Sequence, residues 1–202
     1  TDDRKRLGSI RRESRLTERP FSDTPPAATA GRKRVCHVSG NRSVRTVPLV
    51  LGRTLEHIRI VSPFLLRSTE PPVALAEGKR VVGLERIGKR IVLALAGELF
   101  VVIHLMIAGR FRWLVRDAKV PGKIGLAAFD FPNGTLVLTE AGSKRRASLH
   151  LVKGRIGLTQ FNRGGLDVDR TSLAHFVVAL QRENHTLKRA LTDPTILDGI
   201  GN

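Results

Sequence analysis

The sequence predicts an α+β fold in which a β-sandwich or barrel is followed by a short helical region. Between about residue 49 and residue 152, short runs of Val, Ile and Leu are separated by Gly-rich turns, which is typical of closely spaced strands. After about residue 166 the apolar residues recur at helical spacing instead. The first 48 residues show neither pattern.

Residues 1–48 have the composition of a basic linker. They carry twelve Lys and Arg against five Asp and Glu, with much Ser, Thr and Pro and no periodic apolar face. We expect this segment to be disordered. A basic tail of this kind would support non-specific DNA binding, or it has no function of its own. Because the chain begins with Thr1, we also expect that the natural start is missing or processed.

The stretch from residue 84 to residue 113 organises the strand-rich part. Its two apolar runs, Ile91–Leu95 and Leu99–Leu105, flank Ala96-Gly97-Glu98, which reads as a hairpin turn. Basic residues stand before the first run (Arg86, Lys89, Arg90), and a basic-aromatic cluster follows the second (Arg110, Phe111, Arg112, Trp113). We therefore expect a buried hairpin that holds cations at one edge of a sheet.

Further strands are expected on both sides of this hairpin. Pro132-Asn133-Gly134 is a strong turn signal between two of them. The expected strands are His57–Val61, Val81–Leu84, Leu126–Phe131, Thr135–Thr139 and Ala147–Val152, with a helix ending at Leu51-Gly52, a short helical turn at Val73–Glu77 and a polar loop from residue 115 to residue 125.

Two helices are expected near the C-terminus. The first spans Asp169–Asn184 with Thr171 or Ser172 as its N-cap, and the second spans Thr186–Leu191. Thr192-Asp193-Pro194 would end the second helix and start another, because Pro suits the first helical turn. The turn at Gly199-Ile200-Gly201 could present backbone N–H groups to a phosphate, or it is a helix C-cap.

The charge of the chain indicates a polyanionic partner. The formal net charge is +17 and the isoelectric point about 11.5, which favours nucleic acid or an acidic membrane surface over a merely solvated basic surface. No apolar run approaches the roughly 20 residues of a membrane span, and the N-terminus has no apolar signal region. The single cysteine, Cys36, excludes an internal disulfide framework. A cytoplasmic, nucleoid-associated location is the default.

An RNA-binding β-domain also fits the charge. Such domains commonly stack bases on aromatic residues of a sheet face. This chain has no Tyr, and Trp113 is its one Trp beside scattered Phe, so a stacking platform is poorly supported.

Three segments, in this order, resemble the formamidopyrimidine-DNA glycosylase / endonuclease VIII family: RIGKRIVLALAGELFVVIHLMIAGRFRW, FDFPNGTLVLTEAGSKRRASLHLV and ENHTLKRALTDPTILDGIGN. The resemblance covers about residues 49–202. It implies a β-sandwich domain (residues 49–165) followed by the start of a helix–two-turn–helix DNA-binding domain (166–202). It also implies base-excision repair by a monomeric glycosylase/AP lyase that removes oxidised bases and cleaves the strand by elimination. Its partner would be double-stranded DNA with an oxidised base or an abasic site, with no membrane involved.

The resemblance implies roles for four residues at the hairpin. Lys89 matches a lysine that projects into the lesion site near a phosphate and has a supporting catalytic role, in which its ammonium neutralises phosphate charge and assists proton transfer during strand cleavage. A solvated lysine at a strand start is equally consistent with the pattern. His104 matches a histidine close to the DNA backbone, where a histidine packed in an apolar strand is the alternative. Met106 or Ile107 would wedge into the space left by the flipped base; the family's methionine usually stands one place later than Met106.

Further DNA contacts follow from the same resemblance. Lys144, Arg145 and Arg146 occupy the region where the family probes the opposite strand, although the accompanying aromatic is missing, which leaves readout of the opposite base open. Lys188 matches a phosphate-contacting lysine, and Asn202 an asparagine that binds the phosphates flanking the lesion.

The sequence departs from the family at both ends. The family's nucleophile is the free amine of an N-terminal proline followed by a glutamate, whereas this chain starts Thr-Asp-Asp and its Pro20 and Pro48 are internal. We therefore expect a truncated or frame-disrupted copy of the enzyme, or alternatively a non-catalytic remnant that binds damaged DNA. No cofactor or metal is expected within the chain, since a zinc ribbon, where the family has one, would lie beyond residue 202.

Overall fold

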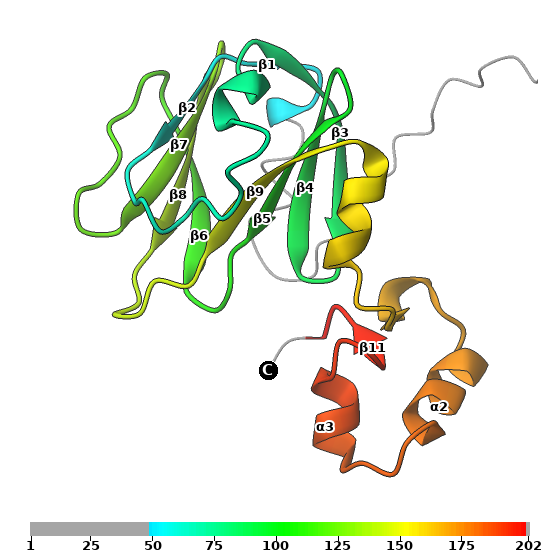
Figure 1. Cartoon of the computed structure of the whole chain (residues 1–202). Coiled ribbons are helices and arrows are strands. Elements are labelled where there is room, and N and C mark those ends of the chain that lie inside the picture. The colour runs from blue at the N-terminus through cyan, green and yellow to red at the C-terminus, as the bar shows by residue number, and fades with distance from the viewer. Residues whose placement is uncertain (1–48, 201–202) are drawn as a thin grey trace, which may run out of the picture. The chain divides into compact units, whose positions relative to one another are not determined.

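The computed structural model describes residues 49–200, and these form two β-sheets with a few short helices (Figure 1). One sheet has five strands and the other four, and a parallel pair of two-residue strands lies in the C-terminal part. The predicted basic segment 1–48 and the predicted contact residue Asn202 lie outside the described residues. None of the helices in the described part is long and apolar enough to cross a membrane.

The five-stranded sheet is antiparallel and contains the predicted hairpin. Its strand order is β1 (Thr54–Leu55), β3 (Lys79–Ile87), β4 (Arg90–Leu95), β5 (Leu99–His104) and β9 (Ser148–Lys153). The predicted turn at residues 96–98 joins β4 to β5, and Gly97 and Glu98 both adopt positive φ there. The strand predicted over Val81–Leu84 is confirmed but extends further at both ends.

The four-stranded sheet contains the second predicted hairpin. Its order is β2 (His57–Ile60), β7 (Gly125–Phe131), β8 (Gly134–Glu140) and β6 (Gly109–Leu114). The basic-aromatic cluster after the first hairpin lies in β6, on this other sheet, so the prediction of one sheet edge holding both groups of cations is wrong. Side chains of β6 alternate between the two faces of its sheet. Phe111 and Trp113 pack against the core between the sheets, whereas Arg110 and Arg112 are exposed on the other face.

The main core lies between the two sheets. Leu93, Val101 and Leu149 of the five-stranded sheet belong to the same buried cluster as Phe129 and Leu136 of the four-stranded sheet. This arrangement agrees with the predicted sandwich, since each sheet buries one face against the other.

A second apolar cluster lies on the outer face of the five-stranded sheet. Val92, Phe100 and Val152 pack there against Leu158 and Phe161. The last two belong to η2 (Arg155–Phe161), a 3-10 helix that no sequence pattern predicted. The short helical turn predicted near Val73 is confirmed as η1 (Val73–Ala76), and the predicted helix end is consistent with helical geometry at residues 49 and 50.

The C-terminal part is smaller and only partly as predicted. It contains β10 (Leu166–Asp167), η3 (Val168–Arg170), α2 (Leu173–Gln181), α3 (Leu187–Thr192) and β11 (Leu197–Asp198). The first predicted helix starts only at Leu173, because the Ser172 hydroxyl caps it by accepting from the His175 N–H.

No helix starts at Pro194 within the described residues. Thr195 donates both its N–H and its hydroxyl to the Asp193 carboxylate, and the Ile196 carbonyl accepts from the Leu166 N–H. The backbone thus turns at Pro194 and enters β11, which pairs with β10. The pairing of β11 with β10, a strand far away in the sequence, thus outweighs the local tendency to start a helix at Pro194.

Candidate functional site

The β3–β4 turn presents Lys89 to solvent. It consists of Gly88 and Lys89 alone, with Gly88 at φ 57°, as expected for a two-residue hairpin with glycine first. A side chain at Gly88 would also collide with the Asp198 carboxylate. Backbone conformation and space therefore both favour glycine beside the exposed lysine.

His104 lies at the same end of the sheet. It pairs directly across from Arg90 of β4 on one side and from Ser148 of β9 on the other. The pKa of His104 is lowered from its ordinary value by partial burial and by the nearby charges of Arg90, Lys89 and Arg163. His104 is therefore a neutral imidazole at pH 7, which can both donate and accept a hydrogen bond.

The connection from β5 to β6 exposes the two candidate wedge residues. The Gly109 N–H donates to the Leu105 carbonyl, and Met106 takes a positive φ of 55° to make this turn. Ile107 is 84% exposed and Met106 38%. Of the two, Ile107 is thus the side chain that projects furthest into solvent.

A buried carboxylate anchors the loop that carries the predicted basic residues 144–146. Glu140, at 2% exposure, accepts from the Arg146 N–H at 3.0 and 3.1 Å and from the Ala147 N–H at 3.1 Å. Lys144, Arg145 and Arg146 are all exposed, and Arg145 donates to the Lys123 carbonyl of the neighbouring loop. The loop is thus fixed at its C-terminal end by Glu140 and is joined to the neighbouring loop through Arg145.

Arg86 is not an exposed cation, although the sequence groups it with Lys89 and Arg90. Its side chain is 13% exposed, and Nη2 donates to Asp167 Oδ1 at 2.6 Å and to Asp169 Oδ2 at 2.8 Å. Nη1 donates to the Gly88 carbonyl at 3.2 Å. Sequence reasoning missed this contact, since no local pattern relates residues 81 positions apart.

Lys188 lies on α3, and its side chain is exposed. None of the hydrogen bonds or ion pairs of residues 49–200 joins Lys188 to Lys89 or His104. The Gly199 N–H, predicted to face a phosphate, donates to Asp198 Oδ1 instead. The alternative of a helix C-cap is also wrong, since Gly199 follows a strand.

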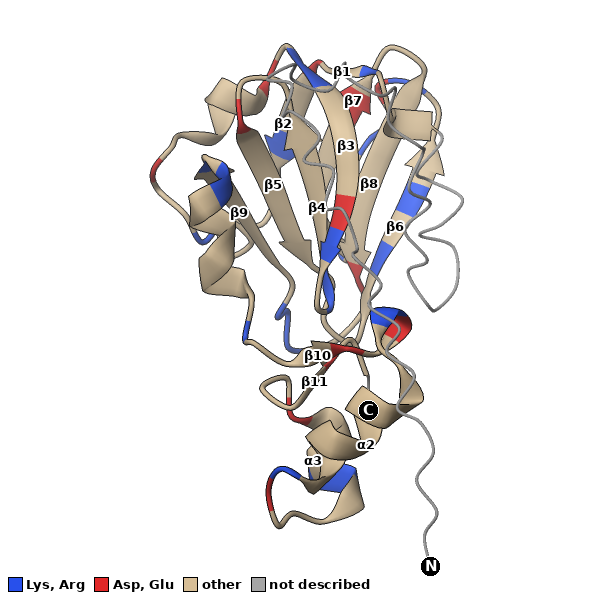
Figure 2. Ribbon diagram, turned by 90° about the vertical axis from the view of Figure 1, so that its right-hand side faces the viewer, with Lys and Arg blue, Asp and Glu red and all other residues tan. Residues whose placement is uncertain are grey.

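Figure 2 shows Lys and Arg along β6 and near the end of β3, with Asp and Glu beside β10. Within residues 49–200, no three His, Cys, Asp or Glu side chains lie close enough together to hold a metal ion.

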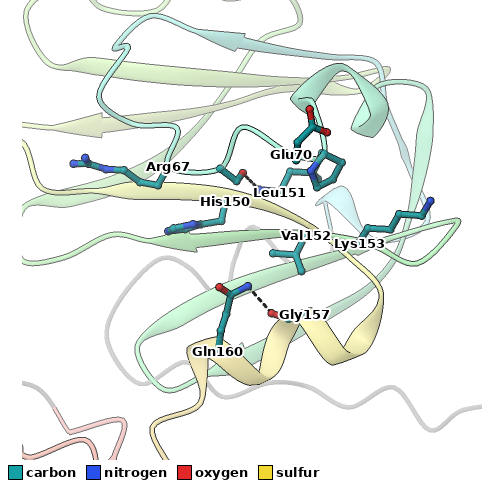
Figure 3. A pocket seen from close by; sticks show the side chains of 10 residues that line it. Arg67, Glu70, His150, Leu151, Val152, Lys153, Gly157 and Gln160 are labelled. Carbon is teal, nitrogen blue, oxygen red and sulfur yellow. Dashed lines mark hydrogen bonds between the residues drawn. The ribbon is translucent and has the colours of Figure 1, made fainter.

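An open hollow of about 620 Å³ lies on the outer side of β9, between the segment 67–71 and η2. Figure 3 shows Arg67 and His150 extending in the same direction, whereas Lys153 points the opposite way. The pKa of His150 is lowered by burial, by Arg90 and by Arg67. Arg90 is thus close to both His104 and His150.

Comparisons with known proteins agree with the arrangement of the sheets. Residues 41–148 match the family model of the formamidopyrimidine-DNA glycosylase N-terminal domain. The formamidopyrimidine-DNA glycosylase of Lactobacillus johnsonii is 28% identical over 161 residues, which cover 77% of this chain and 57% of that protein. The Thermus thermophilus enzyme of the same name is 43% identical over 68 residues, 34% of this chain and 24% of the relative.

Solved structures show the same fold. A complex of the Lactococcus lactis protein with DNA containing FAPY-dG has a TM-score of 0.68 at 20% identity, covering 78% of this chain and 60% of that one. A complex of that protein with DNA containing an abasic site has the same TM-score and identity and covers 78% and 59%. The curated relatives that match 77% of this chain are longer proteins, and the chain spans a little over half of their length.

Proposed function

Because this chain belongs to the formamidopyrimidine-DNA glycosylase family, we propose that it acts in DNA base-excision repair by binding duplex DNA at an oxidised base or an abasic site. The arrangement of residues at one end of the five-stranded sheet supports the proposal. There the exposed Lys89 stands beside the neutral His104, and Ile107 projects from the connection that follows. Family membership leaves an unrelated RNA-binding domain without support.

In this proposal each group has a physical task. The Lys89 ammonium neutralises a phosphate next to the lesion. His104 donates a hydrogen bond to the DNA backbone without adding charge. Ile107 fills the gap left by the extruded nucleotide, because an apolar wedge offsets part of the cost of unstacking, a few kcal/mol. Met106 supports the turn that presents Ile107.

The loop that carries Lys144, Arg145 and Arg146 meets the same end of the sheet, because it leads into Ser148, which pairs with His104, and Gly142 lies beside Ala108. Arg146 and Lys144 would reach the opposite strand from their anchored loop, with Arg145 held back by the Lys123 carbonyl. We propose that α2 and α3 begin a helix–two-turn–helix element in which Lys188 and Asn202 contact phosphates. Leu166, Phe176 and Leu180 pack on Ala190 and Leu197 as a separate apolar cluster, which supports a domain boundary near residue 165.

The full reaction proposed for this family is removal of the damaged base and cleavage of the strand. A free amine attacks the sugar C1′, the base departs with its bonding electrons, and an iminium forms. Loss of a proton from C2′ then expels the 3′ phosphate by elimination. The second candidate function is binding of damaged DNA without base removal or strand cleavage. This function requires only the residues described above at one end of the five-stranded sheet.

One experiment separates the two functions. The chain is incubated with duplex carrying an abasic site, and borohydride is added to reduce any iminium to a stable adduct. A trapped adduct that disappears when the N-terminal amine is blocked supports the enzyme. Absence of an adduct together with salt-sensitive binding supports the binding function. Absence of both contradicts the proposal as a whole.

A further inference from the structure

Two arginines lie beside the proposed lesion contacts and take no part in them. Arg90 is the residue of β4 that pairs with His104, so its side chain lies on the same outer face of the sheet. Arg163 follows η2, two residues after Phe161. Both stand on the side of the hairpin that faces η2.

Arg90 is held in a fixed position. Its Nη1 donates to the Phe161 carbonyl at 3.2 Å, and its guanidinium carbon lies 5.6 Å from the centre of the Phe161 ring. The Phe161 ring also contacts the His150 ring in a T-shaped arrangement, with 5.0 Å between the ring centroids. Stacking on an aromatic ring leaves the outer N–H groups of a guanidinium available, and it reduces the rotamer entropy lost on binding.

Arg163 is presented by a turn. The Asn162 side chain accepts from the Gly164 N–H at 2.9 Å, and Gly164 has a φ of 81°, so the chain bends tightly around residue 163. The Arg163 side chain is exposed. Within residues 49–200 its guanidinium makes no hydrogen bond and no ion pair.

Positive charge exceeds negative charge around Arg90 and Arg163. Arg163 lies close enough to lower the pKa of both Arg90 and His104, with burial as the larger cause in each case. Among residues 49–200, Asp198 is the carboxylate that opposes this effect on Arg90. Like charges held together at a partly buried position are unfavourable unless an anion joins them.

We propose that Arg90 and Arg163 together bind a second phosphate of the DNA strand, next to the phosphate at Lys89 and on the η2 side of the hairpin. The inference rests on the proposed DNA-binding function. A phosphodiester supplies two free oxygens, which match the paired N–H groups of two guanidinium groups. The strand that passes Lys89 would thus continue over Phe161, toward the hollow where Arg67 and His150 lie.

The test uses the whole chain and a duplex with a non-cleavable abasic-site analogue. Arg163→Gln is the informative variant, because the side chain is exposed and its loss leaves the fold intact. Arg116→Gln is the matched control: it removes the same charge from an exposed arginine that pairs with Glu56 and Asp117 on the other side of the sandwich. The dissociation constant is measured over a range of salt concentrations.

We expect Arg163→Gln to weaken binding by about 3- to 10-fold and to make the salt dependence shallower by about 0.9 in the log–log slope, the value of one lost phosphate contact. Arg163→Lys should recover most of the affinity. Arg116→Gln should match the unaltered chain in both measurements.

Duplexes with single neutral methylphosphonates identify the phosphate. One substitution should weaken binding by the unaltered chain and have a smaller effect on Arg163→Gln, in which only the Arg90 contact to that phosphate remains. Equal behaviour of Arg163→Gln and Arg116→Gln, with Lys89→Ala still impaired, would overturn the second phosphate site and leave the proposed function standing. Failure of the unaltered chain to bind the duplex in a salt-dependent way would overturn both.

Discussion

Arg86 Nη2 lies 2.6 Å from Asp167 Oδ1, although the two residues are 81 positions apart in the sequence. The contact joins the end of β3 to β10, and the same guanidinium donates to Asp169 and to the Gly88 carbonyl. The turn that carries Lys89 is thereby tied to the segment that begins the C-terminal part. The position of the proposed phosphate contact depends on this arginine.

Arg86→Gln should destabilise the chain by about 1–3 kcal/mol, because Asp169 loses its ion pair with Arg86 and Asp167 keeps only the longer ion pair with Arg170, around a mostly buried side chain. Urea unfolding measures the change in the free energy of unfolding. Arg155→Gln is the control, since it removes an exposed pair with Glu85 on the same strand and should cost about 0–1 kcal/mol. Equal losses in the two variants would contradict the proposed importance of Arg86.

Lys89→Ala should weaken binding to an abasic-site duplex by about 10-fold, the loss expected for a charge-assisted phosphate contact near the lesion. Binding to intact duplex should weaken less. Lys153→Ala is the control, because Lys153 is an exposed lysine at the opposite end of the same sheet. Gel-shift titration with both duplexes provides the measurement, and equal losses on both would reduce Lys89 to a general phosphate contact.

Ile107→Ala should reduce the preference for lesion over intact duplex by about 3- to 10-fold, because it removes an apolar side chain that inserts into the helix. Its free energy of unfolding should not change, since the side chain is 84% exposed. Fluorescence of a 2-aminopurine placed beside the lesion reports the insertion. A larger effect of Met106→Ala would assign the wedge to Met106.

Asp198→Asn should tighten binding to duplex DNA by about 3-fold, because it removes the carboxylate beside the Lys89 turn and Arg90. Asp117→Asn removes an equal charge from an exposed position in the loop after β6 and should have little effect. Fluorescence anisotropy at several salt concentrations measures both. Weaker binding by Asp198→Asn would show that the carboxylate orders the site rather than opposing DNA.

Stability should fall as the pH drops below about 6.5, the ordinary pKa of histidine. The pKa of His104 is lowered in the folded chain, so between the lowered value and 6.5 the unfolded chain binds more protons, and stability rises with pH. His104→Asn should flatten this part of the pH profile of unfolding. His150→Asn should do the same, as its pKa is lowered by similar causes. An unchanged slope in both variants would refute this origin of the pH dependence.

Much of the sandwich could be predicted because its local signals agree with its tertiary packing. The hairpins at residues 96–98 and 132–134 combine apolar runs with turn residues, so pattern and fold lead to the same structure. The sheet to which Arg110–Trp113 belongs could not be predicted, because alternating residues suit either sheet. At Pro194 the local helix signal lost to pairing with Leu166, which no local pattern reveals.

For the candidate site, the sequence could propose individual residues but not their long-range contacts. Lys89, His104 and Ile107 could be named from one contiguous stretch. The neutralisation of Arg86 and the proximity of Arg163 to Arg90 depend on contacts over more than 70 residues. Electrostatic environment follows from such contacts, and composition alone does not reveal which cations are already paired.

Glu140 has a consequence for how this protein can change over evolutionary time. Its buried carboxylate secures the backbone where the 141–146 loop rejoins β9, so the strands on either side do not rely on the residues at the loop tip. We therefore expect exchanges around Ser143 to alter the exposed surface without disturbing the core, so that recognition of a partner can change while the sandwich stays the same.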